Sequence, residues 1–189
     1  MDLYVSKGNV DASAGSALKD PNELFLRLAD GTFRRAAKAA GILSPIRTRG
    51  AALVDLNRDG LLDLVEVNRY ENVDVRRNVG SGTARKPKSM GHWLGVKLAQ
   101  DGPNSDAIGA WIEVKAGEKR TAREVTVGGG HAGGALGPVH FGLGKRDEAD
   151  VRVTWPDGLQ GAWQRVPADG VITIDHEADE VGTAGSGGS

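Results

Sequence analysis

The chain has 189 residues, of which 28 are glycine, about twice the ordinary share, and none is cysteine. Lysine and arginine number 24 against 25 aspartates and glutamates, so the net charge of −1 argues against a nucleic-acid partner held by a broad basic surface. The lack of cysteine excludes disulfides, thiolate metal sites and cysteine nucleophiles, and no apolar run approaches the roughly 18 residues of a membrane span.

Most of the chain is predicted to form short strands, separated by turn residues such as Asp30-Gly31 and Pro156-Asp157-Gly158. The exception is the alanine-rich segment 34–43, which we expect to form a short helical turn closed by Gly41. Strands that follow one another at roughly 8–12 residues favour a sandwich, a barrel or a propeller, so the predicted fold class is all-β. The expected strands are 23–28, 50–56, 62–68, 92–99, 110–116, 123–128, 138–144, 151–155, 162–166 and 171–175.

The composition changes along the chain and predicts its division into domains. Residues 81–90 are polar and basic without hydrophobic periodicity, which is typical of a linker between a first region, 1–80, and a second, 91–175. Residues 176–189 end in GTAGSGGS and are expected to be a flexible tail. The strand-like DLYVS directly after Met1 is typical of an excised interior fragment.

The strongest chemical signal lies in residues 55–63, DLNRDGLLD, where side-chain oxygens recur at positions 1, 3, 5 and 9. This alternation lets a tight loop surround a hard cation, and Gly60 at position 6 permits the sharp turn. So many protein oxygens in a flexible loop favour Ca²⁺ over Mg²⁺, and a metal-free polar hairpin turn is the alternative. The expected ligands are Asp55, Asn57, Asp59, Asp63 and the carbonyl oxygen of Leu61.

Glu66 stands at position 12 of this loop and formally completes an EF-hand pattern. An EF-hand needs a helix on each side, yet Gly50 and Pro45 precede the loop and the strand-like LDLVEVN follows it. We therefore expect a β-hairpin loop in which Asp63 ligates and Glu66 does not. Such a site holds calcium for structure rather than as a switch.

Residues 52–68, ALVDLNRDGLLDLVEVN, resemble the FG-GAP/VCBS repeat of integrin-like β-propellers. Residues 22–42 resemble the stretch that precedes such a loop, and residues 2–9 resemble the end of an earlier repeat. The resemblance implies one complete and one partial repeat in 1–80. Because a closed propeller needs about four blades or more, it also implies open sheet edges or completion by partners.

Residues 91–175 resemble the ASPIC/UnbV domain, which follows FG-GAP repeats in secreted bacterial proteins and in cartilage acidic protein-like proteins. The resemblance rests on the order and spacing of HWLGVKLAQDGPNSDAIGAWIEVKAG, REVTVGGGHAGG, VHFGLG and VRVTWPDG. It implies a β-sandwich-like module and supplies no catalytic residues. The segment 131–134, HAGG, departs from the family, whose members carry an aromatic residue and Ser/Gln-type residues there.

The loop Gly128–Gly144 holds eight glycines and contains a formal G-x-G-x-x-G. A dinucleotide site needs a helix to begin there, which the following Gly134, Gly137 and Pro138 oppose, so we expect a long loop between strands. The four histidines lack metal-ligand spacing, and the four tryptophans are expected mainly in the core. His131, and Trp155 in the WPDG turn, are the candidate ligand-binding residues.

These observations favour a non-enzymatic, calcium-binding adhesion or recognition module, located extracellularly, in the periplasm or at the cell surface. Its protein or glycan ligand stays open. One alternative is a polysaccharide-positioning accessory region of a larger secreted enzyme. Another is an assembly element whose copies associate through open β edges.

Overall fold

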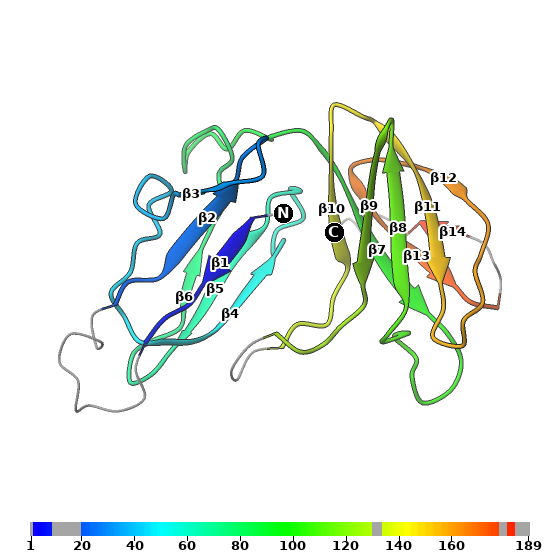
Figure 1. Ribbon diagram of the computed structural model, residues 1–189, viewed down its shortest axis with the longest axis horizontal. Coiled ribbons are helices and arrows are strands. Elements are labelled where there is room, and N and C mark those ends of the chain that lie inside the picture. Colours follow the sequence, from blue (N-terminus) through cyan, green and yellow to red (C-terminus); the bar gives the residue numbers. More distant parts are fainter. Residues whose placement is uncertain (1, 9–19, 130–133, 178–180, 184–189) are drawn as a thin grey trace. The chain divides into compact units, whose positions relative to one another are not determined.

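The computed structural model describes residues 2–8, 20–129, 134–177 and 181–183, and every regular element in them is a β-strand (Figure 1). The all-β prediction is therefore confirmed. Contacts divide the chain into two compact units, which we describe separately. Unit 1 comprises Met1–Leu56, Leu62–Asn78 and Gly128–Ala135, and unit 2 comprises Asn57–Leu61, Val79–Val127 and Leu136–Ser189.

Unit 1 holds two antiparallel three-stranded sheets, ordered β1-β2-β3 and β4-β5-β6. Alternation places a row of apolar side chains on one face of each sheet. Between β3 and β4, the Ala36 carbonyl accepts from the Ala40 amide at 2.9 Å, so the expected helical turn forms. The strands are β1 (Leu3–Val5), β2 (Glu23–Arg27), β3 (Phe33–Arg35), β4 (Thr48–Val54), β5 (Asp63–Asn68) and β6 (Asp74–Arg76).

The interior of unit 1 is largely polar. All buried polar and charged side chains among the described residues belong to this unit, whereas its buried apolar residues are only Ala36, Ala37 and Leu64. Buried polar groups must find hydrogen-bond partners, so polar pairing replaces apolar packing in this unit. The buried polar residues are Asn22, Glu23, Ser44, Thr48, Asp63 and Glu66.

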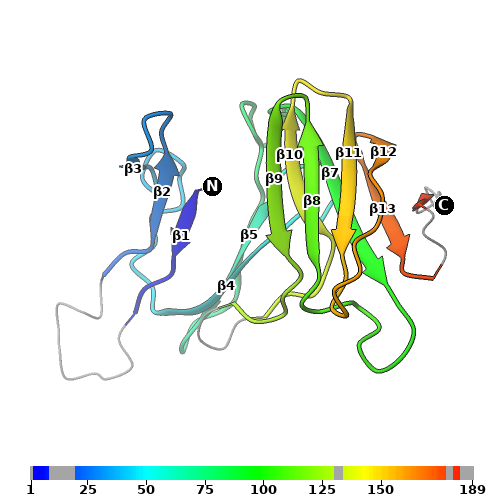
Figure 2. The same ribbon diagram turned by 45° about the vertical axis from the view of Figure 1, so that its right-hand side comes forward.

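Unit 2 is built from two four-stranded sheets, ordered β10-β7-β13-β14 and β12-β11-β8-β9 (Figure 2). Strands β7 and β13 are parallel neighbours, and the other pairs are antiparallel. Both sheets contribute to one apolar core that includes Leu94, Val96, Ile112, Val151 and Ile172. The strands are β7 (His92–Ala99), β8 (Trp111–Ala116), β9 (Lys119–Glu124), β10 (Val139–Gly144), β11 (Glu148–Thr154), β12 (Gln164–Pro167), β13 (Gly170–Asp175) and β14 (Val181–Thr183).

Strands β3 and β6 are not among the expected strands, and β3 includes the first two residues of the expected helical segment 34–43. Three further segments also differ from the expectation. The strand expected at 123–128 lies at Lys119–Glu124, and its sequence KRTARE lacks the apolar alternation of a half-buried strand because it is an exposed sheet edge. Inside the expected linker, Thr83 pairs with Lys86 in a tight turn that belongs to unit 2. Inside the expected tail, strand β14 pairs with β13. The described residues include no helix long and apolar enough to cross a membrane.

Candidate functional site

The acidic loop 55–63 connects two paired strands. Strand β4 ends at Val54 and β5 begins at Asp63, and these two residues face each other in the antiparallel register. The loop is therefore the turn of a β-hairpin, as expected from its flanking sequence, and no helix borders it. Its middle part, Asn57–Leu61, belongs to unit 2, whereas Asp55 and Asp63 belong to unit 1, so each part is described by itself.

Within the middle part, short-range hydrogen bonds hold the side chains of Asn57 and Asp59. Asn57 Nδ2 donates to Asp59 Oδ2 at 2.8 Å, and the Leu61 amide donates to Asp59 Oδ1 at 3.0 Å. The backbone takes left-handed φ values of +61° at Arg58 and +83° at Gly60. This conformation favours glycine, which explains Gly60 at the sharpest part of the turn.

Asp63 is the last residue of the loop and belongs to unit 1. Its side chain is buried, with the whole residue only 2% exposed. Oδ2 accepts from the Leu56 amide at 3.2 Å and Oδ1 accepts from the Asn78 amide at 2.8 Å. A carboxylate has about four lone-pair positions, so these bonds fix its orientation and leave acceptor capacity for a cation.

The donor chemistry of the loop suits Ca²⁺, because three carboxylates, one amide and one backbone carbonyl are the hard oxygen ligands that this ion takes. Among the residues that the structure describes, no group of three or more His, Cys, Asp or Glu side chains is gathered in a way that would hold a metal ion. The loop thus supplies suitable oxygens in a suitable order without a preassembled carboxylate cage. The calcium site stays a prediction.

Gly60 packs against two side chains that the sequence did not indicate. A Cβ atom on Gly60 would lie 2.1 Å from Trp93 Cδ1, so only glycine fits at this position. His140 Nε2 lies 3.0 Å from the Gly60 carbonyl oxygen, which can only accept, so Nε2 carries the proton. The His140 ring stacks on Trp93 with an interplanar angle of 6°. These contacts hold the middle of the loop within unit 2.

Glu66 lies at the centre of a separate polar network in unit 1. The residue is 0% exposed, and its carboxylate accepts from the Tyr4 hydroxyl, Asn22 Nδ2 and, at 2.9 Å, Arg76 Nε. Because Tyr4 lies in β1 while Glu66 and Arg76 lie in β5 and β6, the network joins the two sheets of the unit. Glu66 thus has a structural role of its own.

The network extends through Asn22 to the neighbouring chain segments. Asn22 Nδ2 also donates to Thr48 Oγ1 at 2.7 Å, and Asn22 Oδ1 accepts from the Lys7 amide at 2.8 Å. Thr48 in turn donates to Asn68 Oδ1 at 2.8 Å. The chain segments around β1, β2, β4 and β5 are thereby fixed by one set of mutually satisfied polar groups.

Burial raises the pKa of Tyr4 far above its usual value, and the hydrogen bond to Glu66 and the charge of Glu66 raise it further. The hydrogen bond to Glu66 is also the main cause of the raised pKa of Arg76, whose own burial acts in the opposite direction. Both shifts favour the protonated forms of Tyr4 and Arg76.

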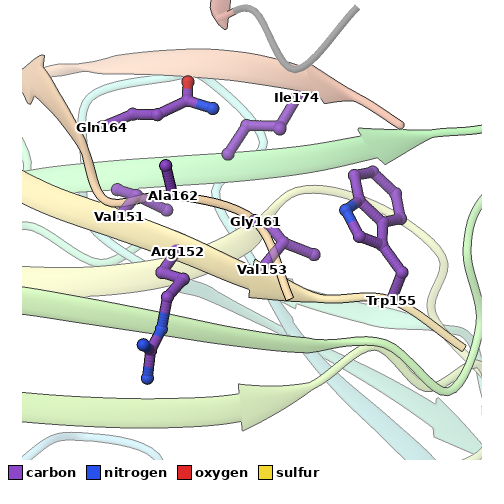
Figure 3. A pocket seen from close by; sticks show the side chains of 8 residues that line it. All are labelled: Val151, Arg152, Val153, Trp155, Gly161, Ala162, Gln164 and Ile174. Carbon is purple, nitrogen blue, oxygen red and sulfur yellow. The ribbon is translucent and has the colours of Figure 1, made fainter. Parts of the chain in front are cut away.

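Of the two candidate ligand-binding residues, His131 lies outside the described residues and Trp155 is in the core. Trp155 is only 5% exposed and contacts the His176 ring edge-on at 4.7 Å between centroids. It lines a shallow recess beside Ile174 that has no room for a water molecule (Figure 3). The indole of Trp155 therefore packs inside unit 2, and its role as a ligand-binding residue stays a prediction.

Two other tryptophans lie outside the core. Trp111 opens β8 with 48% of its surface exposed, and Trp163 is half-buried beneath three cationic side chains. The sequence predicts that these tryptophans lie in or beside strands. It does not show which face of the sheet each of them occupies.

Residues 100–181 match the family model described as ASPIC and UnbV. Most of the second region therefore matches the ASPIC/UnbV family model. The chain is also 43% identical over 70 residues to cartilage acidic protein 1 of Homo sapiens, covering 34% of this chain and 11% of that protein. It is 31% identical over 142 residues to cartilage acidic protein 1 of Xenopus tropicalis, covering 71% of this chain and 21% of that protein. The chain therefore spans about a fifth or less of these relatives, and the match to the family model covers most of unit 2.

Proposed function

We propose that this chain is a non-enzymatic, extracellular recognition module in which calcium stabilises the hairpin loop 55–63 and the ASPIC/UnbV domain presents the recognition surface. The observation that carries the proposal is the donor set of the hairpin loop between β4 and β5, in a chain whose residues 100–181 match the ASPIC and UnbV family model. The similarity to cartilage acidic protein 1 supports a location outside the cytoplasm, at the cell surface or in the extracellular or periplasmic space.

Calcium would stabilise the hairpin loop and, through it, the fold of unit 1. Asp55, Asn57, Asp59, Asp63 and the carbonyl oxygen of Leu61 would hold the ion, which would neutralise three carboxylates within nine residues. Because unit 1 buries few apolar side chains, the free energy of ion binding would add to a stability that apolar packing supplies only weakly. This role requires no opening or closing of the module.

We further propose that unit 1 contains one complete and one partial FG-GAP/VCBS-type repeat. Each of its sheets carries apolar side chains on a partly exposed face, as expected for blades that pack against neighbours on both sides. In the second sheet, Val67 and Val75 are exposed, and Val75 is 59% accessible; in the first sheet, Leu3, Val5 and Phe33 are exposed. The same faces favour the second candidate function, assembly with further sheets of another copy.

Thermal unfolding with and without calcium tests the metal proposal. We expect calcium at about one hundred times its Kd to stabilise the chain by about 2.7 kcal/mol, equivalent to roughly 5–10 °C in Tm for a chain of this size. Asp59→Asn keeps an oxygen for the Leu61 amide but removes one ligand charge, so the calcium-induced shift should shrink strongly.

Asp101→Asn is the matched control, because Asp101 is an exposed aspartate far from the loop in sequence. It should respond to calcium as the unchanged protein does. A melting curve that is identical in excess calcium and in excess chelator would overturn the structural-calcium proposal, and an equal shift in Asp59→Asn would place the ion elsewhere.

A further inference from the structure

Loops from both sheets of unit 2 meet at one end of the unit. Strand β13 is parallel to β7, and β8 is antiparallel to β9 and to β11. The Trp155 ring, directly after β11, contacts the His176 ring, directly after β13, so these strands finish at the same end (Figure 2). We call this end the loop end and define it as residues 100–111, 124–127, 136–138, 155–163 and 175–177.

The loop end exposes large apolar side chains from three different loops. Exposed apolar residues that stand singly are ordinary on a protein surface, whereas neighbouring ones mark interaction sites. The spacing of these residues therefore decides what they mean. They are Ile108, Trp111, Val127, Leu136 and Leu159.

Strand register places Leu159 close to Trp111. Trp111 is the first residue of β8 and faces Thr154 in β11. Thr154 pairs in turn with Gln160, the residue after Leu159. Because neighbouring strands are about 4.8 Å apart, the backbone at Gln160 lies about 10 Å from that at Trp111. The two apolar side chains therefore stand at the same border of the sheet.

A hydrogen bond joins two further loops on the other side of Trp111. The Gly109 amide donates to the Val125 carbonyl at 2.9 Å, which pairs the segment before β8 with the segment after β9. Ile108 precedes Gly109, and Val127 follows two residues after Val125, so both lie near Trp111. We call Ile108, Trp111, Val127 and Leu159 the apolar patch.

The charge around the apolar patch has one sign. The described residues of the loop end include six carboxylates and no lysine or arginine, which gives a formal charge of −6 with histidine neutral, in a chain whose total is −1. None of the six forms an ion pair with a lysine or arginine that the structure describes. The carboxylates are those of Asp101, Asp106, Glu124, Asp157, Asp175 and Glu177.

Cations in the adjoining strands do not cancel this charge. Arg152 and Arg165 are held by Glu113 and Asp150, at 2.8 and 3.0 Å. When every charged residue of the described strands within three positions of the loop end is included, the charge is still −3. These residues are Lys97, Glu113, Arg123, Arg152 and Arg165.

The rest of unit 2 has no such excess of acid. At the opposite end, the turns after β8 and β10 carry both signs, with Glu118 and Asp147 beside Lys145. On the outer face of the sheet β12-β11-β8-β9, Lys115 lies opposite Asp150 in the register. The combination of exposed apolar side chains and unpaired carboxylates therefore belongs to the loop end.

This combination selects the chemistry of an occupant. A nucleic acid or an acidic polymer would be repelled by the carboxylates. A neutral ligand would bury carboxylates without a partner charge, which is costly. A metal ion would satisfy the carboxylates and leave the indole of Trp111 and the side chain of Leu159 uncovered. A polypeptide that carries both cations and apolar side chains satisfies both parts, since lysine and arginine also have apolar stems.

We infer that the loop end of unit 2 docks a basic polypeptide that carries lysine or arginine together with large apolar side chains. The apolar side chains of this partner cover Trp111 and Leu159, and its cations face the surrounding carboxylates. The inference rests on the proposed recognition function and names the class of its partner. It uses no residue of the loop 55–63, so it and the calcium proposal can fail separately.

Peptides of defined composition test the inference on the full chain. The probes are three short fluorescein-labelled peptides, one of lysine and leucine, one of lysine and serine, and one of glutamate and leucine. Fluorescence anisotropy at about 50 mM and about 200 mM salt measures Kd. We expect the lysine–leucine peptide to bind, more weakly at the higher salt concentration. The lysine–serine peptide should bind about tenfold more weakly, and the glutamate–leucine peptide should not bind.

Removal of carboxylates locates the charged part of the site. Asp101→Asn combined with Glu124→Gln should raise the Kd of the lysine–leucine peptide about tenfold and weaken its salt dependence. Glu118→Gln combined with Asp147→Asn removes the same charge at the opposite end of unit 2, and should change Kd less than about twofold. All four side chains are exposed, so both variants should fold.

A separate variant locates the apolar part. Leu159 is 60% exposed, and Leu159→Ser should raise Kd about three- to tenfold while leaving the salt dependence unchanged. Met90→Ser is the matched control, because Met90 is an exposed apolar residue of unit 2 outside the loop end. It should leave Kd unchanged.

Several outcomes would overturn the inference. They are absence of lysine–leucine binding at the lower salt concentration, equal binding of the glutamate–leucine peptide, and equal effects of a variant and its control. Dimers that Leu159→Ser separates, seen by light scattering, would assign the apolar patch to a second copy of the chain instead. Peptide binding should persist in excess chelator. Absence of binding beside an intact calcium-dependent Tm shift would overturn this inference alone, and the reverse pattern would overturn the calcium proposal alone.

Discussion

At the scale of single residues, the carboxylate of Glu66 determines the chemistry of unit 1. It is 0% exposed and is bonded by Tyr4, Asn22 and Arg76. A buried carboxylate is tolerated only when charged or polar partners satisfy it, and removal of one partner leaves the others with unmet hydrogen bonds. The pair of sheets is therefore joined by interactions that depend on the protonation of their members.

Tyr4 allows this dependence to be measured. Folding raises its pKa through burial first and through Glu66 second, so the stability it contributes is fully present below the unfolded pKa of about 10 and is lost as the pH rises through the folded pKa. In Tyr70→Phe, which leaves Tyr4 as the only tyrosine, tyrosinate absorbance should therefore appear well above pH 10. Adding Glu66→Gln should lower that midpoint but leave the part caused by burial.

An absorbance midpoint near pH 10 in Tyr70→Phe would contradict the buried network. Circular dichroism recorded on the same samples provides the control, because it shows whether the tyrosine ionises in the folded chain or only as unit 1 unfolds. In both cases the free energy of unfolding falls as the pH rises, since ionisation of Tyr4 and unfolding of unit 1 favour each other at alkaline pH.

At the scale of elements, the loop 55–63 is a hairpin turn whose middle is held by side chains of unit 2. Gly60 has φ of +83°, and its missing Cβ leaves space for the Trp93 indole. Gly60→Ala should therefore combine backbone strain of about 1–2 kcal/mol with an overpacking cost of about 1–3 kcal/mol. Gly158→Ala, at φ +91° with nothing within 4 Å, should show the strain alone. Thermal unfolding of the two variants measures the difference, and equal Tm values would exclude the contact with Trp93.

Strands with apolar alternation could be predicted from the sequence, and those without it could not. Strand β7 coincides with the expected 92–99 because apolar residues recur at every second position, and Leu94, Val96 and Leu98 all lie in the core. Strand β9 is polar throughout and was expected several residues too late, and β14 lies in a segment whose composition indicates a tail. The pairing that makes these segments strands is supplied by β8 and β13, and no local property of the sequence reveals it.

The candidate sites also divide into those that the local sequence predicts and those that depend on contacts between distant residues. The oxygen ligands of the loop and the hairpin that carries them could be inferred from local spacing, because a turn is formed by neighbouring residues. The Glu66 network joins Tyr4 to residues more than sixty positions away. The cations around the Trp163 ring come from the three strands β8, β9 and β11. Only the fold brings such residues together, and only the fold shows that Trp155 is buried whereas Trp111 is exposed.

At the scale of the whole molecule, the two units differ in what fills them. The apolar core cluster lies entirely in unit 2, whereas unit 1 is filled with polar side chains and leaves valines such as Val67 and Val75 exposed. Apolar burial of about 25 cal/mol per Å² is the main favourable term in folding, so the two units should differ in stability. A unit that relies on polar pairing gains most from a bound cation or from neighbouring sheets.

Hydrogen exchange followed by mass spectrometry tests this difference. Amides of β4, β5 and β6 should exchange faster than those of β7, β8 and β11, because local opening of unit 1 exposes less apolar surface. Calcium should slow the exchange of β4 and β5 and leave β8 and β11 unchanged. If copies of the chain associate through the apolar faces of unit 1, protection of its sheets should rise with protein concentration, whereas a monomer shows none of this rise. Equal protection of both units, insensitive to calcium and concentration, would contradict the view that polar filling makes unit 1 the weaker one.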